Sequence, residues 1–381
     1  MIGSAWENMK GKSREALPET FGDPLPISPD IVFSPEARHA AHGFKRTVRR
    51  LWIAATHPRG PAPLLPANDH VDRIIVIHPG PLRELVFAEP ALRALRLRFT
   101  RAKRVLYAPK DAPDLFAGTG WGEIKPLADL AKATPGRDES CIVLDFTHEA
   151  EYERAKLLRA AKFSHRLGVN VGGRGPFYNI PAVPAMLNDH LADYYLQLAE
   201  LIGTEVVGRT PSLPHGFDRL ERGRNLWREQ EIDHPVILLP GWDGHSFGWP
   251  ADVFTDLAHT MGEMDFVVVA GPEDSLRAKP VADALDCPFY EKVPLSRLMD
   301  MLATAALVVG NDSGHLHLAA ALDSPVVLLT VNPHPWRSWP RAQKGAAVFR
   351  GQVGDSAKVR FDRVPVSDIA AMALRLKERD E

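Results

Sequence analysis

One short stretch, residues 312–317, combines the side chains best suited to chemistry in this sequence. It offers a carboxylate, a hydroxyl, a glycine that permits close backbone approach, and an imidazole. At the start of a helix, such a stretch presents unpaired N–H groups and the positive end of the helix dipole, which suit a phosphate or diphosphate. The plain alternative is an ordinary capped turn, in which the acid only caps the helix and the histidine is a satisfied half-buried side chain. The four residues are Asp312, Ser313, Gly314 and His317.

The flanking sequence predicts a strand, a turn, a helix and a second strand. Apolar runs at 306–309 and 325–329 predict two parallel strands, with a helix at His315–Leu322 between them. A helix that starts beyond the carboxyl end of a parallel strand lies where open α/β sheets bind ligands. His315 and His317 lie on different faces of that helix, so we expect no metal site there.

The rest of the chain alternates strand and helix patterns, which predicts doubly wound, mainly parallel sheets. One set begins near Val71, and another follows the proline-rich segment Gly208–Gly216. We therefore expect an N-terminal extension at 1–70, a Rossmann-like domain at 71–210 and a second at 211–381. Strands are expected at Arg73–Ile77, Arg104–Ala108, Cys141–Phe146, Pro235–Leu239 and Phe266–Ala270, and helices at Leu82–Phe99, Glu151–Ala161, Asp189–Ile202, Asp218–Glu231, Ala251–Met261, Ser275–Ala284, Leu295–Ala305 and Val366–Glu378.

The amino-acid composition limits the classes of protein to which this chain can belong. The 381 residues are 45% hydrophobic and 25% charged, which is typical of a soluble globular protein. A formal net charge of −2 gives no argument for nucleic-acid binding. No apolar run approaches the ~20 residues of a membrane span, and the N-terminus lacks a signal-peptide core. Cys141 and Cys287 lack metal-ligand spacing, so we expect reduced thiols in a cytoplasmic protein.

The extension contains one segment of helical character, Ala37–Ala55, in which basic and apolar side chains are interleaved. A basic amphipathic helix is able to lie on an anionic membrane surface, which would place the protein at the periphery of the inner membrane. The alternative is a helix packed on the body of the protein with its basic face in water. We favour the packed helix.

Several motifs, in the same order, resemble glycosyltransferase family 9, the heptosyltransferases. Residues 312–325 are similar to the C-terminal signature of the family, in which proline is usual at His315 and glycine at Asp323. The resemblance covers roughly Val71 to Pro340 and implies the GT-B fold, two Rossmann-like domains that face a cleft. Further similarities lie at 77–86, 90–96, 144–146, 166–168 and 190–195 and at Pro240-Gly241, Trp249-Pro250 and Gly271–Asp274.

The resemblance implies an inverting transfer of a heptose or related sugar from a nucleotide diphosphate donor to a lipopolysaccharide-type or other glycan or glycolipid acceptor. The donor is a substrate, and neither a metal nor another cofactor is implied. The acceptor belongs to domain 71–210 and the donor to domain 211–381. Backbone groups would hold the diphosphate. Acidic side chains would bind the ribose and the donor sugar, and the imidazole of the histidine would position the donor or the motif. The implied donor-binding residues are Gly241, Glu273, Asp274, Asp312, Ser313, Gly314 and His317.

Three family landmarks differ in this chain. The family carries Gly-Asp where this chain has Arg83-Glu84, so Glu84 is the candidate base that deprotonates the acceptor. Its extra methylene displaces the oxygen by about 1 Å, a shift that can be costly for catalysis. Arg83 adds a positive charge on the acceptor side. Phe247 stands where the family has a phosphate-binding lysine, so Arg83 would have to supply the positive charge that is lost there.

Two functional hypotheses therefore stay open. The first is an active, metal-independent transferase that uses Glu84 as its base. The second is a GT-B protein without transfer chemistry that has a binding or regulatory role. A nucleotide-sugar epimerase of GT-B type has no specific motif support.

Overall fold

The structure is a computed structural model that describes most of the chain after residue 64. The predicted helix at Ala37–Ala55 and the side chains of Phe247 and Glu273 lie outside the described residues. The described segments are 65–67, 70–149, 151–171, 174–182, 189–241, 248–271, 274–332, 335–353, 359–360 and 364–378.

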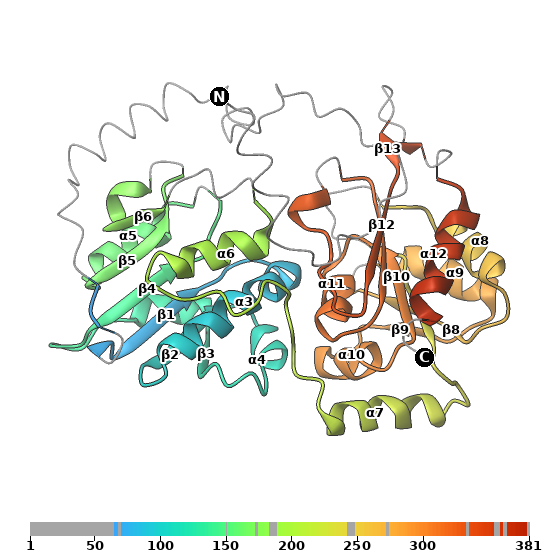
Figure 1. The fold of residues 1–381 in the computed structure, drawn as a ribbon, viewed down its shortest axis with the longest axis horizontal. Coiled ribbons are helices and arrows are strands. Elements are labelled where there is room, and N and C mark those ends of the chain that lie inside the picture. Colours follow the sequence, from blue (N-terminus) through green and yellow to red (C-terminus); the bar gives the residue numbers. More distant parts are fainter. Residues whose placement is uncertain are drawn as a thin grey trace.

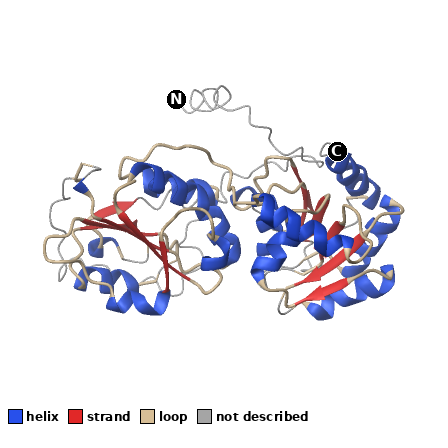
Figure 2. Cartoon of the chain, turned by 90° about the horizontal axis from the view of Figure 1, so that it is seen from below, coloured by secondary structure: helices blue, strands red, loops and turns tan. Residues whose placement is uncertain are grey.

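Two six-stranded parallel sheets lie side by side in separate lobes (Figures 1 and 2). The first lobe has the strand order β3-β2-β1-β4-β5-β6 and the second has β12-β11-β10-β7-β8-β9, which is the same topology repeated. The order reverses between β1 and β4 and between β7 and β10, and such switch points are where doubly wound sheets bind ligands. The strands are β1 (Arg73–Ile77), β2 (Lys103–Ala108), β3 (Glu123–Pro126), β4 (Cys141–Asp145), β5 (His165–Val169), β6 (Ile180–Ala182), β7 (Val236–Leu239), β8 (Phe266–Ala270), β9 (Phe289–Glu291), β10 (Leu307–Asn311), β11 (Val326–Thr330) and β12 (Ala346–Arg350), with a separate antiparallel pair of β13 (Gln352–Val353) and β14 (Val359–Arg360).

Helices cover both faces of each sheet, so the central strands are buried along nearly their whole length (Figure 2). This burial explains why these strands read as continuous apolar runs in the sequence. Of the described helices, none has both the length and the apolar character required to cross a bilayer. The α-helices are α3 (Leu82–Arg98), α4 (Ala112–Leu115), α5 (Glu153–Ala160), α6 (Leu191–Glu200), α7 (Phe217–Arg228), α8 (Ala251–Met261), α9 (Ser275–Leu285), α10 (Leu295–Leu302), α11 (Gly314–Ala321) and α12 (Val366–Glu378), and short 3₁₀ turns lie at Leu127–Lys132, Gly175–Phe177 and Pro335–Arg337.

The GT-B architecture predicted from the sequence is confirmed, and every strand and helix predicted between Val71 and Glu378 is present with boundaries close to those expected. Helix α6 begins at Leu191, two residues later than expected, because the ring of His190 caps it and accepts a hydrogen bond from the Ala192 amide at 3.1 Å. Strands β3, β5, β6, β9 and β12 were not predicted. They lie toward the sheet edges, where burial is less complete and the sequence pattern is mixed.

The turn after α11 contains one of the departures from the family pattern. Asp323, at the position where the family has glycine, adopts a left-handed φ of 68°, and its buried Oδ1 has no hydrogen-bond partner among the described residues. We expect Asp323→Gly to raise the free energy of unfolding by about 1 kcal/mol, because glycine adopts this conformation without strain. Urea denaturation measures the gain. Asp323→Ala keeps the Cβ atom, so an equal gain in that variant would contradict the role of backbone strain.

Candidate functional site

The two lobes meet where helix α3 and helix α11 lie side by side (Figure 1). The start of α11 lies against the start of α3 so closely that a Cβ atom at Gly314 would be 3.1 Å from Leu82 Cβ and 3.2 Å from the Arg83 amide nitrogen. A larger side chain at Gly314 would therefore push the lobes apart. This contact brings the predicted residues 83–84 of the first lobe next to 312–314 of the second.

A buried ionic cluster joins the lobes at this point. Arg83 Nη1 lies 3.1 Å from Asp312 Oδ1, and His317 Nε2 lies 3.0 Å from the same oxygen. Burial by itself raises the pKa of Asp312, but the hydrogen bond from His317 and the nearby charges outweigh it, so the pKa lies below its usual value. Asp312 is therefore a carboxylate at neutral pH, held by one residue from each lobe.

The structure differs from the plain alternatives in two details: the residue that caps the helix and the burial of His317. Ser313, rather than Asp312, is the N-cap of α11, and its hydroxyl oxygen accepts a weak hydrogen bond from the Leu316 amide at 3.4 Å. His317 is only 1% exposed, and its Nδ1 has no hydrogen-bond partner among the described residues. Its ring packs on Phe87 of α3, with centroids 4.9 Å apart. Asp312 and His317 are therefore joined by a hydrogen bond and lie together at the interface between the lobes.

Glu84 lies in the first turn of α3 in a largely buried environment. Its Oε2 is 3.5 Å from the Tyr195 hydroxyl and 3.7 Å from His148 Nδ1. Burial lowers the pKa of His148 to about 4, so this ring is neutral at pH 7 and the contact is not an ion pair. Burial is also the largest influence on Glu84 and raises its pKa to about 7, against the lowering effects of Arg83 and Tyr195. A carboxyl group with this pKa is suited to accept a proton near neutral pH.

Two histidines near Glu84 are not among the residues predicted from the sequence. His78 follows β1 and His148 follows β4, the two strands at the switch point of the first sheet. Burial lowers the pKa of His78 to about 3, and its ring lies 5.0 Å from that of Tyr195. The rule that ligands bind at a switch point would have directed attention to both histidines.

A buried polar network fixes the loop after β4. Arg174 is fully buried and donates from Nη2 to the Thr147 carbonyl at 2.8 Å. Asp145 Oδ1 accepts from the Thr147 amide at 3.0 Å, and Asp145 Oδ2 accepts from the Tyr178 hydroxyl at 2.6 Å. Because hydrogen bonds hold both the amide and the carbonyl of Thr147, the adjacent His148 has a defined position beside Glu84.

Two other predicted donor residues, Gly241 and Asp274, lie together as a second group at the carboxyl ends of β7 and β8. A Cβ atom at Gly241 would lie 2.2 Å from Asp274 Oδ2, and one at Gly271 would lie 2.8 Å from the same oxygen. Asp274 also pairs with Arg277 of α9 at 3.0 Å. Glycine is therefore required beside this carboxylate, and His315 Cε1 would be 3.5 Å from a Cβ atom at Gly271.

Asn311, the last residue of β10, connects this second group to the rest of the site. Its Oδ1 accepts from the Trp249 amide at 2.7 Å, and its Nδ2 donates to the Pro240 carbonyl at 2.7 Å. The buried Trp249 donates from Nε1 to the Thr330 carbonyl at 3.2 Å. These bonds span the switch point of the second sheet and fix the backbone on both sides of it. Among the described residues, no three His, Cys, Asp or Glu side chains are grouped as metal ligands.

Comparison with known proteins identifies the family and the fold. The sequence profile described as glycosyltransferase family 9 (heptosyltransferase) matches residues 147–361. The lipooligosaccharide heptosyltransferase 2 of Haemophilus influenzae is 28% identical over 139 residues, a match that spans 34% of this chain and 40% of that protein.

Two solved structures share the fold. A family 9 glycosyltransferase from Veillonella parvula has a TM-score of 0.66 at 16% identity, covering 82% of this chain and 99% of that one. The ADP-heptose lipopolysaccharide heptosyltransferase II of Escherichia coli also has a TM-score of 0.66, at 19% identity, covering 81% and 99%. Since the family profile matches more than half of the sequence, and both lobes repeat the fold of these structures, the chain belongs to glycosyltransferase family 9 (heptosyltransferase).

Proposed function

We propose that this protein is an inverting, metal-independent glycosyltransferase that moves a heptose or related sugar from a nucleotide diphosphate to a glycan or glycolipid acceptor of the lipopolysaccharide type. One observation carries the proposal. Glu84, a carboxyl group with its pKa raised to about 7, lies next in sequence to the arginine that binds Asp312 at the switch point of the other sheet. A candidate base and a candidate donor site are thereby adjacent.

In the proposed reaction, the acceptor hydroxyl oxygen attacks the anomeric carbon of the donor sugar. The bond from that carbon to the diphosphate oxygen breaks, and the nucleoside diphosphate leaves with the electron pair. Attack from the face opposite the leaving group inverts the anomeric configuration. Glu84 takes the proton of the acceptor hydroxyl, since it is the buried carboxylate on the first-lobe side of the interface.

Arg83 is proposed to bind the leaving diphosphate. In the structure it pairs with Asp312, and its side chain retains 24% exposure. Moving from Asp312 to a diphosphate would exchange one anionic partner for another, and it would leave Asp312 with His317 to hold the donor sugar. Gly241 and Asp274, with Glu273, are proposed to hold the remainder of the nucleotide, and Ser313 and Gly314 to contribute helix-start amides.

The pH dependence of transfer tests the role assigned to Glu84. Because its pKa is about 7, we expect the rate to rise as pH increases through 7 and then to level off. The hydrogen bond from the Tyr195 hydroxyl favours the ionised carboxylate, so Tyr195→Phe is expected to move this limb to higher pH. Rate profiles between pH 5 and 9 measure the shift. A limb that stays in place would contradict the assigned contact.

The donor assignment is tested by calorimetric titration with ADP, UDP, GDP and dTDP. We expect micromolar binding of one nucleotide, and ADP is the first choice because the E. coli relative of the same fold is described as using ADP-heptose. Asp274→Asn removes the charge beside Gly241 and is expected to weaken that binding at least tenfold, with thermal unfolding as the control for folding. If no nucleotide binds, the non-catalytic alternative is favoured.

The acceptor and the place of action follow from the same proposal. A lipid-linked glycan acceptor would bring the protein to the cytoplasmic face of the inner membrane. Transfer from ADP-heptose to truncated lipopolysaccharide cores, followed by release of ADP, is the direct assay. A protein that binds nucleotide but releases no ADP with any core would be a binding or regulatory member of the family.

A further inference from the structure

A cavity of about 640 Å³ lies away from the predicted catalytic residues, on the other side of helix α3. Its volume falls within the ~300–1,000 Å³ range of small-molecule sites. One wall is the part of α3 that contains Glu89, Arg93 and Arg96, and the other is the connection between the lobes, Ser212–Phe217. Neither the sequence motifs nor the proposed transfer reaction uses this cavity.

Much of the cavity lining is apolar, and several of its side chains are aromatic. Phe116 and Trp121 come from the segment between β2 and β3, and Phe217 comes from the start of α7. Phe217 is 72% exposed, although large aromatic side chains are usually covered. The other apolar lining residues include Leu92, Leu213, Pro214 and Leu220. A flat aromatic body fits such a lining by stacking and burial.

Two donor groups of the lining residues are buried and have no hydrogen-bond partner in the described part of the chain. Trp121 is 2% exposed, and its indole N–H has no hydrogen-bond partner among the described residues. The same holds for the buried Nε of Arg93. The Arg96 side chain forms no hydrogen bond within the described part of the chain, and it interacts electrostatically with Glu89, which is already bound by the Ser212 amide at 2.9 Å and by Arg93 at 3.5 Å. Arg93 is already paired with Glu89 and bound to the Thr210 carbonyl, so the Arg96 guanidinium is the positive group that an anion in the cavity would meet.

We propose that this cavity binds a small aromatic anion, a molecule with an aromatic ring and one carboxylate, sulfonate or phosphate group. The ring lies among Phe116, Trp121 and Phe217, and the anionic group lies at Arg96. The site does not depend on the proposed transfer function.

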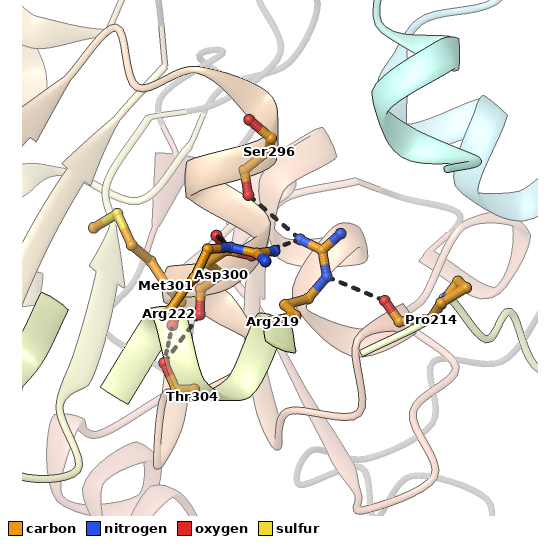
Figure 3. Close-up of polar contacts among 7 residues, drawn as sticks. All are labelled: Pro214, Arg219, Arg222, Ser296, Asp300, Met301 and Thr304. Carbon is orange, nitrogen blue, oxygen red and sulfur yellow. Dashed lines mark hydrogen bonds and ion pairs between the residues drawn. The ribbon is translucent and has the colours of Figure 1, made fainter. Parts of the chain in front are cut away.

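The walls of the cavity are fixed to both lobes. Arg93 Nη2 donates to the Thr210 carbonyl at 3.1 Å on the first-lobe side, and the Leu213 amide donates to the Ala321 carbonyl at the end of α11 at 2.8 Å. Figure 3 shows the further attachment to the second lobe, where Arg219 donates from Nε to the Pro214 carbonyl at 3.1 Å and pairs with Asp300 of α10 at 3.0 Å. Arg222 binds the other oxygen of the same buried carboxylate at 2.7 Å.

An occupant would therefore restrain both helices that meet at the predicted catalytic residues. Helix α3 carries Glu84 at its start and Arg93 about 14 Å further along at 1.5 Å per residue. Helix α11 begins beside Asp312 and ends at Ala321, where the connection is attached. An occupant of the cavity therefore contacts segments that are attached to both lobes.

The test uses 1-naphthalenesulfonate as the anionic probe and 1-naphthylmethylammonium as the cationic control, each titrated into the full-length protein by calorimetry. We expect the sulfonate to bind and the cation to bind at least tenfold more weakly. Hydrogen exchange should then show protection at 113–121 and 212–217. Equal binding of both probes, no binding of the sulfonate at 1 mM (about the weak limit for a specific site), or protection confined to 82–84 and 312–314 would each overturn the proposal.

A matched pair of charge reversals locates the anionic group. Arg96→Glu, which places a negative charge at the cavity, is expected to weaken sulfonate binding more than tenfold. Arg98→Glu, an exposed position on the same helix outside the cavity, is expected to leave it within twofold. Both arginines are at least partly exposed, so both variants should fold, and thermal unfolding checks this. Equal loss in the two variants would mean nonspecific attraction to a basic surface and would overturn the site.

Discussion

Glu84→Gln is expected to lower the rate of sugar transfer by about 10²- to 10⁴-fold, the usual contribution of a general base. The amide has nearly the same shape as the carboxyl group but accepts no proton. Nucleotide binding should be retained, because all the proposed donor residues except Arg83 lie in the second lobe and the substitution leaves Arg83 in place. Steady-state rates with saturating donor and calorimetric titration of the nucleotide measure the two quantities.

The loss in this variant should not reflect unfolding. Burial raises the pKa of Glu84 from 4.5 in the unfolded chain to about 7, so the folded protein binds more protons and becomes less stable as pH rises through that window. Replacing this acid with an uncharged amide is therefore expected to stabilise the fold at pH 8. Glu139→Gln is the control, since Glu139 pairs with Arg73 at the opposite, amino end of the first sheet. Full activity in Glu84→Gln would show that another group is the base.

Asp312→Ala is expected to lower the free energy of unfolding by about 3 kcal/mol, the cost of removing one partner from a buried ion pair. The substitution leaves Arg83 and the fully buried His317 without their shared acceptor. It should also abolish nucleotide binding if the donor site is where we propose. Urea denaturation at pH 7 gives the stability, and titration at a temperature where the variant is folded gives the affinity.

The pH dependence of stability provides a second measure of the same residue. The folded-state pKa of Asp312 lies below its ordinary value of 3.8, so its contribution is present above that pH and is lost as pH falls further. The difference between wild type and Asp312→Ala should therefore shrink in acid. Asp256→Ala, at an exposed position of α8, is the control and should change stability by less than about 0.5 kcal/mol. A constant difference between pH 2 and 7 would contradict the ionic role.

The sequence by itself determined the architecture. The buried central strands are continuous apolar runs such as Val326–Thr330, and amphipathic helices alternate with them, so burial on both sheet faces is visible in the pattern. Short edge strands such as Phe289–Glu291 have no such burial, and local pattern did not reveal them. The motif at 312–317 was also correctly placed at a helix start, because its apolar flanks and small polar residues act locally.

Only the tertiary structure decided how the candidate residues are combined. Arg83 and Asp312 are 229 positions apart, and their contact depends on the packing of α3 against α11 at the lobe interface. The burial that raises the pKa of Glu84 depends on tertiary packing, since its neighbours Tyr195 and His148 come from elements distant in sequence. The cavity behind α3 likewise depends on where the connection between the lobes is attached. Sequence periodicity reports which face of an element is buried, but not which partner buries it, and the partner sets distance, charge and pKa.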